Sequence, residues 1–271
     1  MPIIPPSVSM LQSSSRYETE AVAAVYLEAE WSDMLLGRSE NCKVSPLDQI
    51  LQRATPSFYL RIVTIALMAC KEHSIQPNRI CDVGSATGRT IYELTRQLDG
   101  VTVAIALEPS HLLHSWAIRL LVDHPSNLAI PTVGAWNSPG RMAVSGSSIE
   151  RFQNLEKIQF LNCTLEQFPE PSADFDLIVC CNLLDRHPSP STLVTAIHKK
   201  LRPGGLLILS SPLEFGVDVS DSFTEIGSTV QSFLPEASWS IVSASEELYD
   251  LRLYLRKWVR YVSQVVVAVR R

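Results

Sequence analysis

The stretch "RICDVGSATGRTIYEL", residues 79–94, decides the fold of this chain. It starts with mostly aliphatic residues, as a buried strand does, and continues from Ile91 with apolar residues at helical spacing. The strand carries Asp82, and Gly84 and Gly88 lie between it and the helix. Glycine permits positive φ and leaves no Cβ to keep a ligand away from the backbone. The stretch therefore predicts a strand, a turn able to hold a ligand, and a helix.

The composition is that of a globular protein without a nucleic-acid partner. Of the 271 residues, 46% are hydrophobic and 19% are charged, and the net charge is −5. Because nucleic-acid phosphates are bound by clustered Lys and Arg, this acidic balance argues against nucleic acid. Six cysteines without a C-x-x-C pair or a Cys/His ligand spacing predict free thiols and no metal site.

The sequence gives no indication of a membrane partner or of secretion. The longest apolar run, residues 62–70, is too short to cross a bilayer. Residues 1–15 lack the charged and continuous apolar regions of a signal peptide. We therefore expect a cytoplasmic protein, whose oligomeric state the sequence leaves open.

Strand-like and helix-like segments alternate from residue 79 onward. The strand-like segments are residues 79–83, 101–107, 157–162, 175–184, 206–211, 238–245 and 260–270. Helical patterns follow the first, second and fourth of them. Such alternation predicts an α/β fold with a doubly wound, mostly parallel sheet of seven strands. The last two segments are expected to pair as an antiparallel hairpin at the sheet edge.

We predict a single domain with additions to the alternating pattern. Residues 1–15 are rich in Pro and Ser and are expected to form a disordered tail. Residues 16–75 contain helical patterns and predict a helical cap before the first strand. Residues 122–157 break the alternation and predict an insertion with two possible short strands. Since no linker divides the chain, residues 16–271 are interpreted as one domain.

The glycine turn restricts the class of ligand. In a doubly wound fold, ligands bind at the carboxyl ends of the strands, where this D-x-G-x-x-x-G turn lies. The turn lacks the G-x-G-x-x-G of dinucleotide folds and the G-K-[ST] of phosphate loops. Glu108 ends the next strand, and a carboxylate there can accept both hydroxyls of a ribose. The pattern favours a nucleoside-type ligand, although Asp82 and the glycines could instead serve only to shape the turn.

Four segments together resemble class I methyltransferases that use S-adenosylmethionine (SAM). They are "DVGSATG" at 82–88, "ALEPS" at 106–110, "FDLIVCCNLL" at 175–184 and "LRPGGLLILSS" at 201–211. SAM is a sulfonium cation without phosphates, which fits a turn without lysine. The resemblance implies SAM as the cofactor, held by Asp82, Gly84, Ser85, Gly88, Glu108, Thr164 and Asn182.

A narrower resemblance is to the methyltransferase portion of ovothiol synthases, over residues 16–271. It rests on "YETEAVAAVYLEAEW" at 17–31, "NLLDR" at 182–186, "SSPLEF" at 210–215 and "RKWVRYVSQVVVAVRR" at 256–271. It implies methylation of an imidazole nitrogen in a small, thiolated histidine. Protein-histidine methyltransferases carry a related "NLLDR", so a protein acceptor stays open. Another natural-product N- or O-methylation, or a catalytically idle SAM-binding scaffold, also stays open.

Two departures from the family pattern concern the cofactor pocket and the acceptor. The family's strand near residue 160 usually runs into Gly-Asp, whose carboxylate can meet the adenine amino group, but this chain has Cys163 and Thr164. The first helix usually ends in a His-Tyr-Gly-like sequence, where this chain has Glu30 and Trp31. The second difference falls where the substrate cover is expected, so the identity of the acceptor stays open.

We predict catalytic and substrate-binding roles for five residues. Asn182 would orient the substrate, Asp185 would accept an imidazole N–H, and Arg186 would pair with Asp185 or meet a substrate carboxylate. Tyr17 would close the site, and Arg252 would bind an amino-acid carboxylate. A neutral imidazole offers its own lone pair at physiological pH, so no strong base is required.

The same residues also have simple structural interpretations. Asp185 could cap the helix that follows it, and Arg186 could be a solvated surface residue. Arg252 lies among other basic residues, where a solvated face is at least as common as a carboxylate-binding site.

Overall fold

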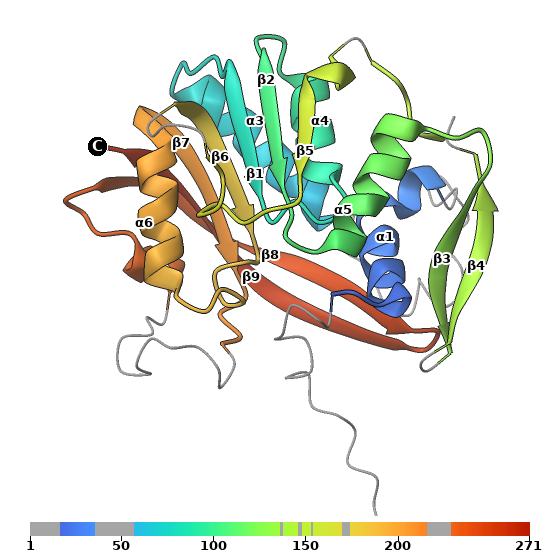
Figure 1. Cartoon of the computed structure of the whole chain (residues 1–271). Helices are drawn as coiled ribbons and strands as arrows, with labels where there is room; N and C mark the ends of the chain where they lie inside the picture. The colour runs from blue at the N-terminus through green and yellow to red at the C-terminus, as the bar shows by residue number, and fades with distance from the viewer. Residues whose placement is uncertain are drawn as a thin grey trace, which may run out of the picture.

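A seven-stranded sheet in the order β5-β2-β1-β6-β7-β9-β8 forms the centre of the molecule (Figure 1). The computed structural model describes residues 17–35, 57–135, 138–145, 148–152, 154–169, 174–215 and 229–271. The sheet strands are β1 (Arg79–Val83), β2 (Val103–Leu107), β5 (Ile158–Leu161), β6 (Phe175–Cys181), β7 (Leu201–Ser211), β8 (Trp239–Tyr254) and β9 (Lys257–Arg270). The first five strands in the spatial order are parallel to one another. β9 runs antiparallel to both of its neighbours, β7 and β8. The predicted fold class is confirmed.

The direction of winding reverses at β1. The chain runs outward from β1 to β2 and β5, and then returns to β6 on the other side of β1. The crossovers contain α4 (Arg89–Gln97), α5 (His111–Ile118) and α6 (Pro190–Lys200). The carboxyl ends of β1 and β6 therefore flank a topological switch point, which is where ligands bind in open α/β sheets.

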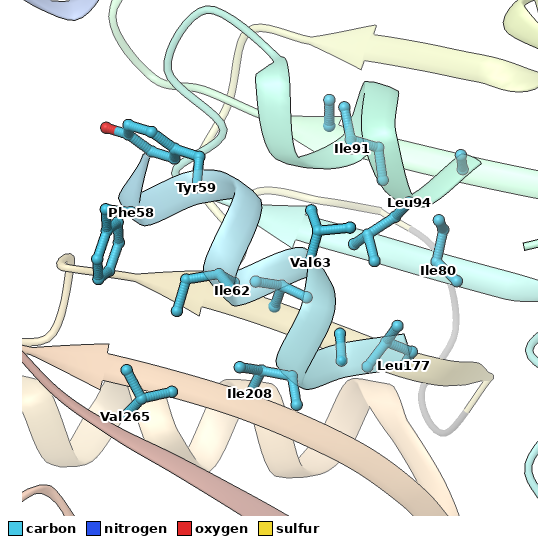
Figure 2. Close-up of a cluster of buried hydrophobic side chains, with 14 of the residues drawn as sticks. Phe58, Tyr59, Ile62, Val63, Ile80, Ile91, Leu94, Leu177, Ile208 and Val265 are labelled. Atoms are coloured by element: carbon cyan, nitrogen blue, oxygen red, sulfur yellow. The ribbon is translucent and has the colours of Figure 1, made fainter. Parts of the chain in front are cut away.

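The helix α3 (Phe58–Glu72) packs on one face of the sheet (Figure 2). Its Ile62 and Val63 lie in one apolar cluster with Ile80, Leu177 and Ile208 from three neighbouring strands. These side chains are all at most 2% exposed. Because both faces of the central strands are covered, the strands are almost continuously apolar rather than alternating.

The helix α1 (Glu20–Leu35) lies against a separate two-stranded sheet formed by the insertion. The strands β3 (Leu128–Ala135) and β4 (Ser138–Val144) pair antiparallel, and Figure 1 shows this hairpin beside α1. Trp31, Leu128 and Ile130 share an apolar cluster. At the far end of the hairpin, the Leu255 N–H donates to the Gly134 carbonyl. The predicted insertion thus holds α1 close to the tip of the β8–β9 hairpin.

Several boundaries differ from the sequence predictions. β7 begins at Leu201 rather than at residue 206, so the "RPGG" sequence lies within the strand. β8 and β9 are much longer than the predicted segments, because pairs such as Tyr249–Tyr261 and the Asp250–Arg260 ion pair extend the ladder. The short helices are a π-helix at Arg119–Asp123 and 3₁₀-helices at Leu155–Lys157 and Val230–Phe233. The predicted tail and residues 36–56 of the predicted cap lie outside the described residues.

Candidate functional site

The turn after β1 has a left-handed backbone at three positions. Gly84, Ala86 and Gly88 have φ of 75°, 47° and 89°. A Cβ on Gly84 would lie 3.2 Å from Leu183 Cδ2, and one on Gly88 would lie 3.0 Å from Phe160 Cε1. The turn needs glycine at these two positions, since a side chain there would meet both an unfavourable φ and a close neighbour.

A cavity of about 480 Å³ opens at the carboxyl ends of the central strands. Near the turn its lining includes Asp82, Gly84, Ser85, Glu108 and Thr164. Its lining also includes Tyr17, Tyr26, Tyr59, Asn182, Arg186, His187, Tyr249 and Tyr261. Most of the residues predicted to hold a cofactor therefore lie together along one part of this cavity.

Two buried carboxylates face the cavity from neighbouring strands. Glu108 accepts hydrogen bonds from the Ala86 and Ser110 N–H groups, at 2.9 and 2.8 Å. Asp82 Oδ2 has no hydrogen-bond partner within the described part of the chain. Burial raises the pKa of both carboxyl groups to about 7, and the charge of Glu108 also acts on Asp82. A buried carboxylate oxygen without a partner is a place where a ligand hydroxyl or cation lowers the cost of burial.

Asn182 lies at the end of β6 in a left-handed conformation, with φ of 51°. Its Oδ1 accepts hydrogen bonds from Ser210 Oγ at 3.0 Å and from Ser263 Oγ at 2.5 Å. The carboxamide oxygen is thus held by β7 and β9. The side-chain NH₂ of Asn182 therefore remains available to donate hydrogen bonds to a ligand in the cavity.

Tyrosines form a large part of the cavity lining. Five of the seven tyrosines of the chain line it: Tyr17, Tyr26, Tyr59, Tyr249 and Tyr261. The hydroxyls of Tyr59 and Tyr249 lie 3.1 Å apart. Burial raises the pKa of all five phenols above the ordinary value, so they are neutral donors and acceptors at physiological pH.

A comparison with known families agrees with this geometry. A sequence model of the family described as "Methyltransferase domain" matches residues 51–257, which is well over half of the chain. The chain belongs to this family. As a methyltransferase of class I architecture, it uses SAM as its cofactor.

Curated relatives of this methyltransferase include ubiquinone biosynthesis O-methyltransferases. The protein of Cereibacter sphaeroides strain ATCC 17023 is 28% identical over 139 residues, which are 49% of this chain and 53% of the relative. The protein of Ruegeria pomeroyi is 26% identical over 138 residues, with the same shares. The chain thus spans about half the length of the curated relatives it matches.

Two solved structures illustrate the likeness of the fold. The YcgJ protein of Bacillus subtilis has a TM-score of 0.50 and 10% identity, over 78% of this chain and 99% of that one. Magnesium protoporphyrin IX methyltransferase from Synechocystis PCC 6803, solved with bound SAM, has a TM-score of 0.48 and 12% identity, over 93% and 98%. The likeness to YcgJ shows the fold alone.

The residues of the methyltransferase cavity fit SAM. Asp82 and Glu108 supply the negative charge and the acceptors that a sulfonium cation and a ribose require, and Gly84 leaves the backbone open. When bound, SAM supplies an electrophilic methyl group. Within the described residues, no group of acidic, His or Cys side chains could hold a metal ion, and no helix is long and apolar enough to span a membrane.

Three predicted site residues of the methyltransferase lie outside the cavity lining. Gly88 packs behind the turn against Phe160 and Leu121. Arg252 donates to Glu28 Oε1 at 3.3 Å and to the Leu255 carbonyl at 2.7 Å, so its guanidinium is not placed to bind a substrate carboxylate in the cavity. The sequence shows neither placement, because both depend on contacts between distant elements.

Asp185 is the third of these residues. It is 1% exposed, accepts a hydrogen bond from Ser211 Oγ at 2.8 Å, and pairs with Arg186 Nε at 3.4 Å. Arg186 does line the cavity, and its Nη2 donates to Glu214 Oε2 at 2.7 Å. Asp185 therefore lies behind the wall of the cavity, and its Oδ2 has no hydrogen-bond partner within the described part of the chain. The direct contact with a substrate N–H stays a prediction.

Glu30 and Trp31 are not part of the cavity lining either. Both contact the buried Thr87 hydroxyl, Glu30 Oε2 at 2.6 Å and Trp31 Nε1 at 2.9 Å. Tyr17 and Tyr26, from the start and middle of the same segment, do line the cavity. Tyr17 thus lines the cavity at the position predicted for it, whereas the other four tyrosines were not selected from sequence.

Proposed function

We propose that this chain transfers the methyl group of SAM to a ring nitrogen of a small aromatic acceptor. The acceptor to test first is a histidine-derived imidazole, including a thiolated histidine of the ovothiol type. The neutral phenols around the acceptor end of the cavity carry this proposal. They can stack on a flat ring and hydrogen-bond its edge, but they cannot remove a proton at neutral pH.

This chemistry suits an acceptor that needs no base. An imidazole has a reference pKa of about 6.5 and is mostly neutral at physiological pH, whereas a phenol of pKa about 10 is not ionised. Asp185, the acidic side chain nearest in sequence to Asn182, is turned toward Ser211 and Arg186. An in-line displacement can gain about 7–11 kcal/mol from positioning alone. We therefore propose that the rate acceleration comes from the alignment of a neutral acceptor nitrogen by Asn182 and the tyrosines.

Arg186 is the proposed contact for a polar substituent of the acceptor. It lines the cavity while Asp185 and Glu214 fix its orientation. Its charge is balanced by these two carboxylates. Arg186 is therefore expected to orient a polar substituent by hydrogen bonds more than to attract an anion by net charge. The ovothiol-type acceptor remains a proposal, since the curated relatives named above are O-methyltransferases. We also propose that the partner is a small molecule and that the protein is cytoplasmic.

Phenol O-methylation is the second candidate. His187 and Glu166 both line the cavity, and His187 Nε2 lies 3.2 Å from Glu166 Oε1. A histidine paired with a carboxylate can act as a general base for a hydroxyl acceptor. The O-methyltransferase names of the curated relatives favour the same candidate.

A turnover screen distinguishes the two candidates. Purified full-length protein is incubated with SAM labelled in its methyl group and with histidine, thiolated histidines, a histidine peptide or catechols, and the products are analysed by mass spectrometry. We expect label on a ring nitrogen of the histidine-type small molecules. Label on catechol oxygen alone, lost in His187→Asn, would support the second candidate and reject the first.

A further inference from the structure

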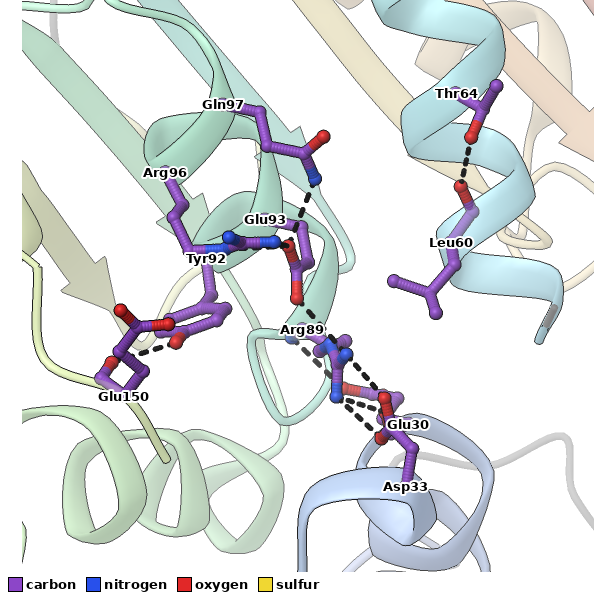
Figure 3. Close-up of polar contacts among 10 residues, drawn as sticks. All are labelled: Glu30, Asp33, Leu60, Thr64, Arg89, Tyr92, Glu93, Arg96, Gln97 and Glu150. Carbon is purple, nitrogen blue, oxygen red and sulfur yellow. Dashed lines mark hydrogen bonds and ion pairs between the residues drawn. The ribbon is translucent and has the colours of Figure 1, made fainter. Parts of the chain in front are cut away.

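The helix α1 holds the turn before α4 through Glu30, which is 2% exposed. Its carboxyl group accepts hydrogen bonds from Thr87 Oγ1 at 2.6 Å and from the Thr87 N–H at 3.4 Å. It also accepts a hydrogen bond from the Arg89 N–H at 3.2 Å (Figure 3). The Arg89 N–H is the first N–H of α4, whose N-cap residue Gly88 has no side chain to bind it, and Thr87 directly precedes this N-cap. Glu30 therefore supplies, from a distant helix, the acceptor that a capping residue normally supplies locally.

Two neighbouring residues of α1 reinforce this contact. Trp31 Nε1 donates to Thr87 Oγ1 at 2.9 Å, and Asp33 accepts from both Nη groups of Arg89 at 2.8 Å each. The Arg89 guanidinium lies over the Trp31 ring, 4.9 Å from its centroid, and pairs with Glu93 at 3.0 Å. Thr87, Arg89 and Glu93 are at most 2% exposed. Because the network is out of water, removing one partner leaves a buried polar group unsatisfied.

The other side of the same turn faces the cavity. Gly84, Ser85 and Ala86 line it, and the Ala86 N–H donates to Glu108 at 2.9 Å. The turn is thus held on its cavity side by Glu108 and on its far side by Glu30. Without either acceptor, the backbone of the turn would be less fixed, and the cofactor would contact a turn that no longer has a single conformation.

The tyrosine part of the cavity lining also depends on α1. Tyr26 lies one helical turn before Glu30, on the same face of the helix, and lines the cavity together with Tyr17. A displacement of α1 would therefore move Tyr26 away from the acceptor and Glu30 away from the turn at the same time.

We propose that Glu30 is a positioning residue, which fixes the cofactor turn only while α1 is docked, so that α1 couples cofactor binding with acceptor binding. This inference rests on the proposed function, because it assigns the two ends of the cavity to cofactor and acceptor. The coupling is reciprocal, since a ligand that stabilises docked α1 at one end raises affinity at the other.

Calorimetry with S-adenosylhomocysteine tests the positioning role. This probe is SAM without the methyl group, and it is titrated into wild type, Glu30→Ala, Glu30→Gln and the control Glu20→Ala. Glu20 lies on the same helix but forms a partly exposed pair with Arg141. We expect Glu30→Ala to weaken binding by at least about tenfold, the loss expected when buried hydrogen-bond donors are left without an acceptor, and Glu30→Gln to weaken it less. Glu20→Ala is expected to bind as wild type does.

A folded Glu30→Ala protein that binds the probe as tightly as wild type would overturn the positioning role. If Glu30→Ala does not fold, Glu30→Gln decides the question. In that variant the side-chain NH₂ faces a backbone N–H, so we expect weaker probe binding and faster hydrogen exchange at Thr87 and Arg89. Unchanged values of both quantities would reject the proposal.

Hydrogen exchange in the wild type tests the coupling. We expect the probe to slow exchange both in the turn at residues 84–89 and along α1, including the amides around Tyr26. Slowing that is confined to the turn would reject the coupling. A wild-type protein that binds neither the probe nor SAM would instead reject the proposed function, so the two failures are distinguishable.

Discussion

Asp82 and Glu108 illustrate how single residues of this site respond to their surroundings. Both carboxyl groups are buried, and burial raises the pKa of each to about 7. In the unfolded chain such groups ionise near pH 4, so their contribution to the stability of the ligand-free protein is complete below that pH. It is lost as the pH rises through about 7. A bound sulfonium reverses this preference, because a cation favours the ionised carboxylates.

We therefore predict that the affinity for SAM increases between pH 6 and pH 8, by roughly tenfold for each carboxylate that must ionise. Calorimetric titration of SAM at three pH values measures this change. The variant Asp82→Asn is expected to bind more weakly and to show a shallower pH dependence. An affinity that is constant from pH 6 to pH 8 would show that neither carboxylate has to lose a proton for binding.

The position of Asp185 predicts a role through Arg186. Asp185→Asn keeps an acceptor for Ser211 but removes the charge beside Arg186. We expect turnover with the best acceptor to fall by about tenfold, which corresponds to about 1.4 kcal/mol in the activation free energy. SAM binding is expected to stay within about twofold, because Asp185 does not line the cavity.

Glu214→Gln provides the matched control for this variant. Glu214 contacts the same guanidinium from a partly exposed position, so its loss should have the smaller effect. Wild-type turnover in Asp185→Asn would remove Asp185 from any role in positioning.

At the scale of elements, the link between β1 and α4 is the most sensitive junction. A Cβ at Gly88 would lie 3.0 Å from Phe160 and 3.1 Å from Leu121, at a φ of 89°. We predict that Gly88→Ala lowers the free energy of unfolding by about 2–4 kcal/mol, from backbone strain and overpacking together. Thermal denaturation should show a decrease in Tm of several degrees.

Gly204→Ala separates the two causes. Gly204 has a similar φ of 74°, but its nearest neighbour, Arg202 Nη1, lies 3.6 Å away. This variant carries the strain without the overpacking, so a loss of about 1–2 kcal/mol is expected. Equal losses in the two variants would mean that packing behind the cofactor turn contributes nothing.

The elements themselves were predictable to different degrees. The central strands were recognisable because burial on both faces makes them continuous apolar runs. The long terminal strands were predicted too short, since residues 246–254 include four charged residues and rely on cross-strand pairs with β9. The β3–β4 hairpin was expected only as two possible strands, and its packing against α1 had no local signal.

At the scale of the whole molecule, the cavity is assembled from segments far apart in the sequence. The glycine turn and the ends of β1 and β2 form one part of it, and all of these residues lie between 79 and 110. The acceptor end combines α1, α3, β6, β8 and β9. Contacts such as Tyr59–Tyr249 join residues 190 positions apart. Variation in these distant segments can therefore change the acceptor without altering the cofactor turn.

The sequence by itself determined the sheet, the glycine turn and most of the residues near that turn that line the cavity. These features depend on local order, because a strand, a glycine turn and a helix that follow one another must meet at one edge of a parallel sheet. Only the tertiary structure decided that five tyrosines line the cavity, that Asp185 lies behind Arg186, and that Glu30 accepts a hydrogen bond from the first N–H of α4. Those arrangements arise from packing between distant elements, and burial then determines which groups remain charged.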